Sequence, residues 1–231
     1  MSDPKPCSTP LDIVGLQYGL PHFAKALKRQ RKIKVVAFGS SSTAGADGVM
    51  PFPPRLEMLL RGEKQLFGRL IDVINRGVGG QEAPEEFSRI EADVVAEAPS
   101  LVIWQVGTNA VYKDSYNFDE VQASFAAGLD VLAALPLDVV VMDSQYTQAI
   151  ADKPDRVKLF MPMIAKVAAD KNVNLFRRFE LMKRWVADGV LLSELDDGAK
   201  EHLHTSKCAT RCITQALFDA INDALTRDAT T

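Results

Sequence analysis

Five short apolar runs, each followed by a longer stretch of helical character, constrain the fold of this chain more than any other feature. The runs cover residues 33–38, 71–75, 101–106, 139–142 and 173–176. A short continuous apolar run is typical of a strand that is buried on both faces. Strands that alternate with helices indicate βαβ units and therefore a parallel sheet. The sequence predicts an α/β fold, a flavodoxin-like three-layer α/β/α sandwich with a parallel sheet of about five strands.

The stretches between these runs predict the helices and the domain organisation. Helices are expected over residues 21–31, 54–66, 84–98, 118–135, 153–171, 177–188 and 207–226. In residues 84–98, for example, Phe87, Ile90 and Val94 recur at helical spacing. The length of 231 residues suits one α/β domain. We expect residues 1–32 to form an N-terminal extension with a first helix, and residues 33–231 to form the single domain.

Composition excludes two classes of partner. The net charge of −3 leaves no basic surface of the kind that binds nucleic acid. No apolar run is long enough to cross a membrane. Residues 1–6 lack the apolar core of a secretory signal, so the chain as given is expected to be cytoplasmic. A periplasmic or secreted protein whose signal has been removed is the alternative, and the oligomeric state stays open.

The three cysteines leave the redox state open. They are Cys7, Cys208 and Cys212. Cys208 and Cys212 are four residues apart on a predicted helix, which is a poor geometry for a mutual bridge. A disulfide from Cys7 to Cys212 or Cys208 would need an oxidising compartment, and three free thiols are the alternative.

Small and polar residues follow several of the predicted strands. Ser41 lies just after the first strand, Gly80 after the second and Asn109 after the third. The carboxyl ends of parallel strands meet at one edge of a sheet, where open α/β sheets bind their ligands. A late polar loop adds Glu201 and His204. A hydroxyl, an imidazole, a carboxylate and two candidate oxyanion donors are the groups that an acyl-transfer site needs. Ser41 as a simple helix cap is the alternative interpretation.

Four segments resemble the conserved blocks of the SGNH (GDSL-type) hydrolase family. Residues 38–45, Phe-Gly-Ser-Ser-Ser-Thr-Ala-Gly, are similar to the first block, which carries the nucleophile in a Gly-Asp-Ser-Leu run. Residues 75–80, Asn-Arg-Gly-Val-Gly-Gly, are similar to the second block. Residues 106–109, Val-Gly-Thr-Asn, are similar to the third, and residues 201–204, Glu-His-Leu-His, to the last. The blocks occur in the family's order on the expected strand ends.

The resemblance implies a serine esterase without a metal or cofactor. Ser41 takes the nucleophile position, His204 that of the base and Glu201 that of the acid. The amides of Ser41 and Gly80 and the side chain of Asn109 take the positions of the oxyanion hole. The implied substrates are small acyl esters or O-acetylated carbohydrates. A carbohydrate O-acetyltransferase on the same scaffold and a catalytically silent binding module are the alternatives.

Three positions depart from the family pattern. Ser40 replaces the aspartate of the first block, Ala110 replaces the aspartate that often follows the asparagine, and Glu201 stands where aspartate is usual. Asp196 and Asp197 lie close enough in sequence to compete with Glu201 as the triad acid. The family spacing nevertheless predicts that Glu201→Gln lowers activity more than Asp196→Asn or Asp197→Asn.

Three further features have alternative interpretations: the second histidine of the last block, the glycine cluster and the asparagine of the third block. His202 competes with His204 as the base, but the family spacing and the alternation of side chains in an extended loop favour His204. The glycines at 77, 79 and 80 have the spacing Gly-x-Gly-Gly, which is not a dinucleotide-binding fingerprint. Asn109 would otherwise cap the end of a strand.

Overall fold

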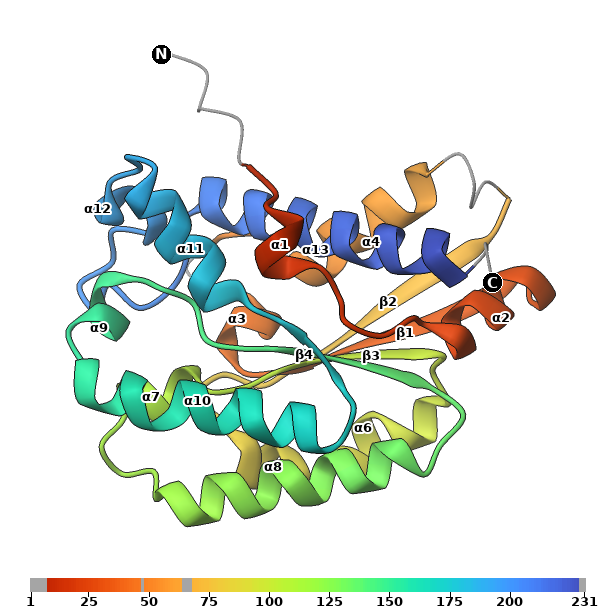
Figure 1. Ribbon diagram of the computed structural model, residues 1–231, viewed down its shortest axis with the longest axis horizontal. Coiled ribbons are helices and arrows are strands. Elements are labelled where there is room, and N and C mark those ends of the chain that lie inside the picture. The colour runs from red at the N-terminus through yellow and green to blue at the C-terminus, as the bar shows by residue number, and fades with distance from the viewer. Residues whose placement is uncertain (1–7, 47, 64–67, 229–231) are drawn as a thin grey trace.

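The predicted α/β class and parallel sheet are confirmed by the computed structural model, which describes residues 8–46, 48–63 and 68–228 (Figure 1). The described residues form one five-stranded sheet with the order β2-β1-β3-β4-β5, and every neighbouring pair is parallel. The strands are β1 (Lys32–Gly39), β2 (Leu70–Gly77), β3 (Leu101–Gln105), β4 (Asp138–Met142) and β5 (Asn174–Phe176). All five overlap the predicted runs.

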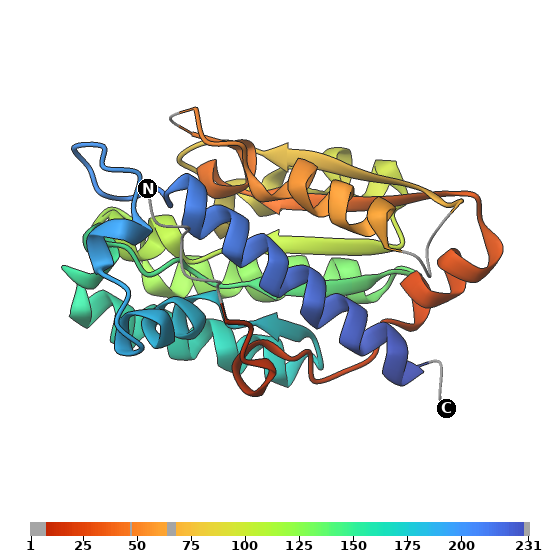
Figure 2. The same ribbon diagram turned by 90° about the horizontal axis from the view of Figure 1, so that it is seen from above.

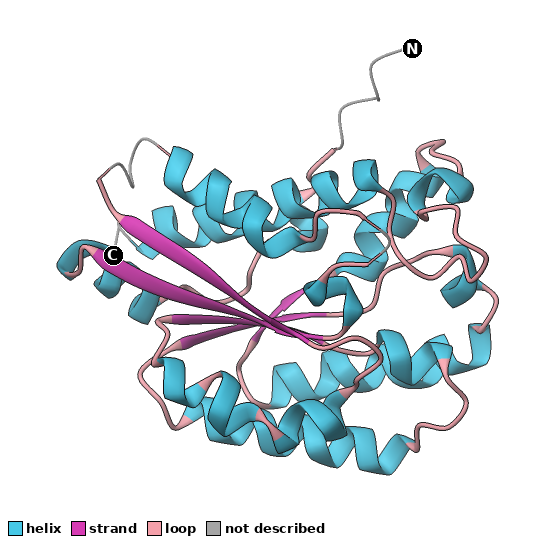
Figure 3. Ribbon diagram, turned by 180° about the vertical axis from the view of Figure 1, so that it is seen from behind, coloured by secondary structure: helices cyan, strands magenta, loops and turns pink. Residues whose placement is uncertain are grey.

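Helices cover both faces of the sheet because the strands are apolar on both sides. In β1, Val35 and Ala37 belong to one hydrophobic core, and Val36 and Phe38 to the other. The first core is covered by α1 (Leu11–Val14), α2 (Pro21–Arg29), α4 (Phe52–Gly62), α11 (Arg178–Ala187) and α13 (Lys207–Asp228). The second is covered by α5 (Ala83–Ser88), α6 (Ile90–Asp93), α7 (Thr108–Tyr112), α8 (Phe118–Ala133) and α10 (Pro154–Asp170). Figure 3 shows the strands between these two layers, and Figure 2 shows α13 crossing its face of the sheet beside α4.

The strand order favours a ligand site between the carboxyl ends of β1 and β3. From β1 the chain moves to β2 on one side and then returns to β3 on the other side. Open α/β sheets bind ligands at such a reversal, outside the carboxyl ends of the strands. The short helix α3 (Ser41–Ala44) follows β1, and α7 follows β3. The serine and asparagine blocks therefore begin at this reversal.

The predicted helix over residues 84–98 is wrong, because the structure breaks it into three pieces. They are α5, α6 and the 3₁₀ turn η2 (Val95–Glu97). The first break falls at Arg89, whose backbone has φ −113° and ψ 6°. Its guanidinium donates to the carbonyls of Gly39 (3.0 Å) and Arg76 (2.9 Å), which ties this point to the ends of β1 and β2. The short helices α3, α7, α9 (Gln148–Ala151) and α12 (Leu192–Leu195) were not predicted, since four or five residues carry no periodic pattern.

Two sequence expectations stay predictions. Cys7 lies outside the described residues, so a bridge from it to Cys212 stays a prediction. Cys208 is a half-buried free thiol and Cys212 is disulfide-bonded, so the alternatives of a bridge to Cys208 and of three free thiols are wrong. The division at residue 32 is likewise untested, although α2 packs on the sheet. No helix within the described ranges has the length and apolar character needed to cross a bilayer.

Candidate active site

Two glycines let α3 pack directly against the ends of the strands. At Gly39, which has φ +150°, an added Cβ would lie 2.7 Å from Oγ1 of Thr43 in α3. At Gly77 an added Cβ would lie 2.1 Å from the backbone nitrogen of Ala44 in α3. Any side chain at either position would push α3 away. The glycines therefore fix Ser41, the first residue of α3, at the carboxyl edge of β1 and β2.

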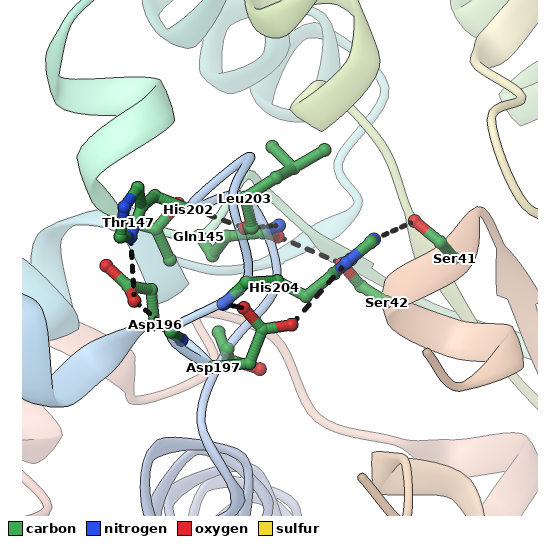
Figure 4. Close-up of polar contacts among 12 residues, drawn as sticks. Ser41, Ser42, Gln145, Thr147, Asp196, Asp197, His202, Leu203 and His204 are labelled. Carbon is green, nitrogen blue, oxygen red and sulfur yellow. Dashed lines mark hydrogen bonds and ion pairs between the residues drawn. The ribbon is translucent and has the colours of Figure 1, made fainter. Parts of the chain in front are cut away.

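The structure brings a hydroxyl, an imidazole and a carboxylate into one row (Figure 4). Ser41 Oγ lies 3.0 Å from Nε2 of His204, and Nδ1 of His204 lies 3.8 Å from Oδ2 of Asp197. Asp197 is fixed by its own amide, which donates to the His204 carbonyl (3.0 Å), and by the Ala199 amide, which donates to Oδ1 (3.0 Å). Its Oδ2 is buried and has no hydrogen-bond partner among the described residues. A buried carboxylate oxygen without a hydrogen bond is costly, and Nδ1 of His204 is the nearby polar atom that faces it.

The expected contact between Glu201 and His204 is not found. Glu201 is exposed, and among the described residues it makes no hydrogen bond or ion pair with His204. Glu201 lies inside a turn, in which the amide of His202 donates to the carbonyl of Ala199 (3.0 Å) and His202 has φ +48°. This turn directs Glu201 to solvent. The carboxylate beside the imidazole belongs instead to Asp197, one of the two alternatives that the sequence left open.

His202 lies on the other side of the same loop. Its Nδ1 is 3.2 Å from Oδ1 of the buried Asp196, and half of its side chain is exposed. Figure 4 shows the ring directed away from Ser41. Of the two candidate histidines, only His204 is in contact with the Ser41 hydroxyl.

The two other predicted oxyanion donors are Gly80, in the loop after β2, and Asn109, in the first turn of α7, and these two segments contact each other beside Ser41. An added Cβ on Gly79 would be only 3.9 Å from the Cβ of Ser41, so the second loop lies against the serine. Gly80 has φ +80°, and its amide has no hydrogen-bond partner among the described residues. The buried Asn109 donates from Nδ2 to the carbonyl of Gln81 (2.8 Å), which holds it against the same loop.

The two departures beside these groups have their own partners. The hydroxyl of the buried Ser40 donates to Oε1 of Gln105 (2.8 Å). An aspartate there would place a second acceptor against this oxygen, which explains the serine. The amide of Ala110 donates to Oε2 of Glu82 (2.8 Å), so a carboxylate from another segment reaches this part of the site.

Sequence reasoning missed Gln145, which joins three parts of the site. Its Oε1 accepts from the hydroxyls of Ser42 (3.0 Å) and Thr108 (2.9 Å), and its Nε2 donates to the carbonyl of Leu203 (3.0 Å). Thr147 Oγ1 donates to the same carbonyl (3.0 Å). A polar side chain just after the buried strand β4 was the available signal. Through Leu203, Gln145 holds the loop that carries the histidine.

Replacing Gln145 with leucine should lower the free energy of unfolding by about 1–3 kcal/mol, since buried polar partners lose this side chain. Urea unfolding followed by circular dichroism measures it. Gln148→Leu is the matched control, because among the described residues the side chain of Gln148 bonds only the exposed Asp152 carboxylate (2.7 Å). It should change stability by less than about 0.5 kcal/mol. Equal losses in the two variants would contradict a special role for Gln145.

The site opens into a very small cavity. A cavity of about 20 Å³ is lined by Ser41 and His204 together with Val49, Pro51 and Thr210. A larger cavity of about 620 Å³ lies at the opposite edge of the sheet, and none of the candidate site residues lines it. The described residues hold no group of three or more His, Cys, Asp or Glu side chains arranged for a metal ion.

Comparison with known proteins identifies a matching family and structures with a similar fold. Residues 6–227 match the non-GDSL lipase-like family. The chain has no match among curated protein sequences. Its structure is similar to Axe2, an acetylxylan esterase from Geobacillus stearothermophilus, with a TM-score of 0.66 and 18% identity over 82% of this chain and 94% of that chain. It is also similar to LAE5, an alpha/beta hydrolase enzyme from the metagenome of Lake Arreo, with a TM-score of 0.67 and 16% identity over 82% of this chain and 95% of that chain.

The similarity to these structures concerns the fold, and the family match concerns nearly the whole chain. Together, the family match and the shared fold confirm the resemblance to SGNH-type hydrolases. The family's description also agrees with residues 39–42, Gly-Ser-Ser-Ser, which replace the Gly-Asp-Ser-Leu run. The protein is a member of the non-GDSL lipase-like family.

Proposed function

We propose that the protein is a serine esterase that hydrolyses small acyl esters, O-acetylated carbohydrates among them, through an acyl-enzyme on Ser41. The observation that carries this proposal is the 3.0 Å contact between Ser41 Oγ and His204 Nε2. A nucleophile within hydrogen-bond reach of a base is the arrangement that activates a serine hydroxyl. This contact favours an active hydrolase over a silent binding module.

The reaction uses His204 as a base and then as an acid. His204 takes the proton of Ser41 while Oγ attacks the acyl carbon, and the carbonyl oxygen becomes an oxyanion. The amides of Ser41 and Gly80 and the Asn109 side chain donate to that oxygen, each worth about 3–4 kcal/mol of barrier. The tetrahedral intermediate then collapses, and His204 gives its proton to the leaving alcohol. A water then attacks the acyl-enzyme while His204 takes its proton, and His204 returns that proton to Ser41 Oγ as the C–O bond to the enzyme breaks and the acid leaves.

Asp197 takes the role of the triad acid in this proposal. Its Oδ2 faces Nδ1 of His204 at 3.8 Å, which is an ion-pair distance rather than a hydrogen bond. Catalytic hydrogen bonds are often long without substrate and shorten when substrate binds. The carboxylate would fix the imidazole tautomer and stabilise the imidazolium that forms during the reaction.

The size of the cavity supports a short acyl group. About 20 Å³ leaves room for little more than a methyl group between Val49, Pro51 and Thr210. We expect kcat/KM to fall about tenfold or more from p-nitrophenyl acetate to p-nitrophenyl butyrate, because the extra methylenes displace these walls. The leaving group is the same in both esters, so the ratio reports the acyl side alone. Equal or faster turnover of the butyrate would contradict this assignment of the acyl pocket.

Acetate release from an O-acetylated xylo-oligosaccharide tests the function. Axe2, described as an acetylxylan esterase, supports this choice of substrate. We expect acetate to appear in water at a rate that an added acceptor sugar does not change. Transfer to the acceptor that exceeds hydrolysis would identify an O-acetyltransferase instead. No turnover of this substrate or of p-nitrophenyl acetate from about pH 6 to about pH 9 would identify a binding module.

A further inference from the structure

Glu82 connects the two segments that carry the oxyanion donors Gly80 and Asn109. It is the N-cap of α5, two residues after Gly80, and its side chain is buried. Its Oε1 accepts from the amide of Gly107 (2.8 Å), and its Oε2 accepts from the amide of Ala110 (2.8 Å). These two amides stand on either side of Asn109 in the sequence. One carboxylate therefore forms hydrogen bonds at both ends of the short segment that presents the Asn109 side chain.

A further hydrogen bond joins the same two segments, and it too has its donor on the Asn109 segment. Asn109 Nδ2 donates to the carbonyl of Gln81, the residue between Gly80 and Glu82. Gly80 and Asn109 are thus joined through one short piece of chain and three hydrogen bonds. We propose that Glu82 is a positioning residue that sets the spacing between the Gly80 amide and the Asn109 side chain at the oxyanion; this inference rests on the proposed function.

The neighbouring Glu86 shows why the charge belongs on Glu82. Glu86 is also buried; its Oε2 accepts from Trp104 Nε1 (2.7 Å), and its Oε1 has no hydrogen-bond partner among the described residues. Burial, and then the negative charge of Glu82, hold the pKa of Glu86 well above its usual range. Burial also raises the pKa of Glu82, but the amides of Gly107 and Ala110 oppose that shift. Two amides from the Asn109 segment favour the charged form of Glu82, whereas burial and the charge of Glu82 disfavour the charged form of Glu86.

The two glutamates provide a matched pair of substitutions. Glu82→Gln replaces one accepting oxygen with an NH₂ group that faces an amide N–H. One of the two hydrogen bonds from Glu82 to the Asn109 segment is therefore lost. Glu86→Gln is nearly isosteric with a neutral acid and still accepts from Trp104. We expect Glu82→Gln to lower kcat for p-nitrophenyl acetate about tenfold to a hundredfold while KM changes less than about threefold, since the oxyanion exists only in the transition state. Glu86→Gln should keep kcat within about twofold of the parent.

A coupling measurement separates positioning from general destabilisation. If Glu82 acts through the asparagine, Glu82→Gln should cost much less in an Asn109→Ala background than in the parent. Full additivity, an effect on KM alone, or an equal loss of kcat in Glu86→Gln would overturn the proposal. Should Glu82→Gln not fold, Glu82→Asp keeps the charge but is one methylene too short to reach both amides. It should also lower kcat, and parent-like kcat in Glu82→Asp would overturn the proposal.

The failure of this inference differs from the failure of the proposed function. If Ser41→Ala keeps its esterase activity, the proposed function is wrong and the role of Glu82 falls with it. If Ser41→Ala is inactive while Glu82→Gln has parent-like kcat, only the positioning role is wrong.

Discussion

Replacing Ser41 with alanine is expected to lower kcat/KM for p-nitrophenyl acetate by about a thousandfold or more. The variant loses the oxygen that forms the acyl-enzyme but keeps His204 and the oxyanion donors, which accounts for any residual rate. Steady-state kinetics measures the loss, and thermal unfolding checks that the fold is kept. His204→Ala should lose about as much, and the double variant should lose little more than either, because the two groups act as one unit.

The two neighbouring serines are the controls for this result. The hydroxyl of Ser40 bonds Gln105, and that of Ser42 bonds Gln145, so each has a structural partner away from the imidazole. Ser42→Ala removes one hydrogen bond and should keep kcat/KM within about tenfold of the parent. A larger loss in Ser42→Ala or Ser40→Ala than in Ser41→Ala would show that Ser41 is not the nucleophile.

Asp197→Asn is expected to lower kcat about a hundredfold or more. The carboxamide keeps the shape of the side chain but removes the negative charge that faces Nδ1 of His204, so the imidazolium of the transition state is no longer stabilised. Steady-state kinetics of the three carboxamide variants of this loop measures the difference. Asp196→Asn and Glu201→Gln are the controls, because Asp196 contacts His202 and Glu201 is exposed. Each should keep kcat within about tenfold.

This order reverses the one that the family spacing predicts. Glu201 stands three residues before His204, but the turn at His202 carries its side chain to solvent. Glu201→Gln costing more than Asp197→Asn would restore the original assignment and contradict the geometry of this loop.

The fold and the convergence of the site were predictable because both depend on local patterns. Buried strands are continuous apolar runs, and their carboxyl ends share one edge of a parallel sheet whatever the loops do. Ser41, Gly80 and Asn109 could therefore be placed together from the sequence. The break at Arg89 was not predictable, since it coincides with hydrogen bonds to carbonyls at the ends of distant strands.

Sequence patterns could not predict which carboxylate serves as the triad acid, nor the partners in the buried polar network. The loop from Asp196 to His204 has no periodicity, so the direction of each carboxylate depends on turns that only the folded chain fixes. Gln145 and Glu82 find their partners on segments far away in the sequence. A polar residue beside a buried strand end signals such a network, but its partners are set by tertiary structure.

Trapping with a fluorophosphonate followed by peptide mapping tests the central claim most directly. The reagent phosphonylates an activated serine and leaves a stable adduct that mass spectrometry locates. We predict one adduct, on Ser41, formed at least about a hundredfold more slowly in His204→Ala because the imidazole no longer takes the proton. An adduct on Ser40, Ser42 or another residue, or labelling of Ser41 that is equally fast without His204, would contradict the account.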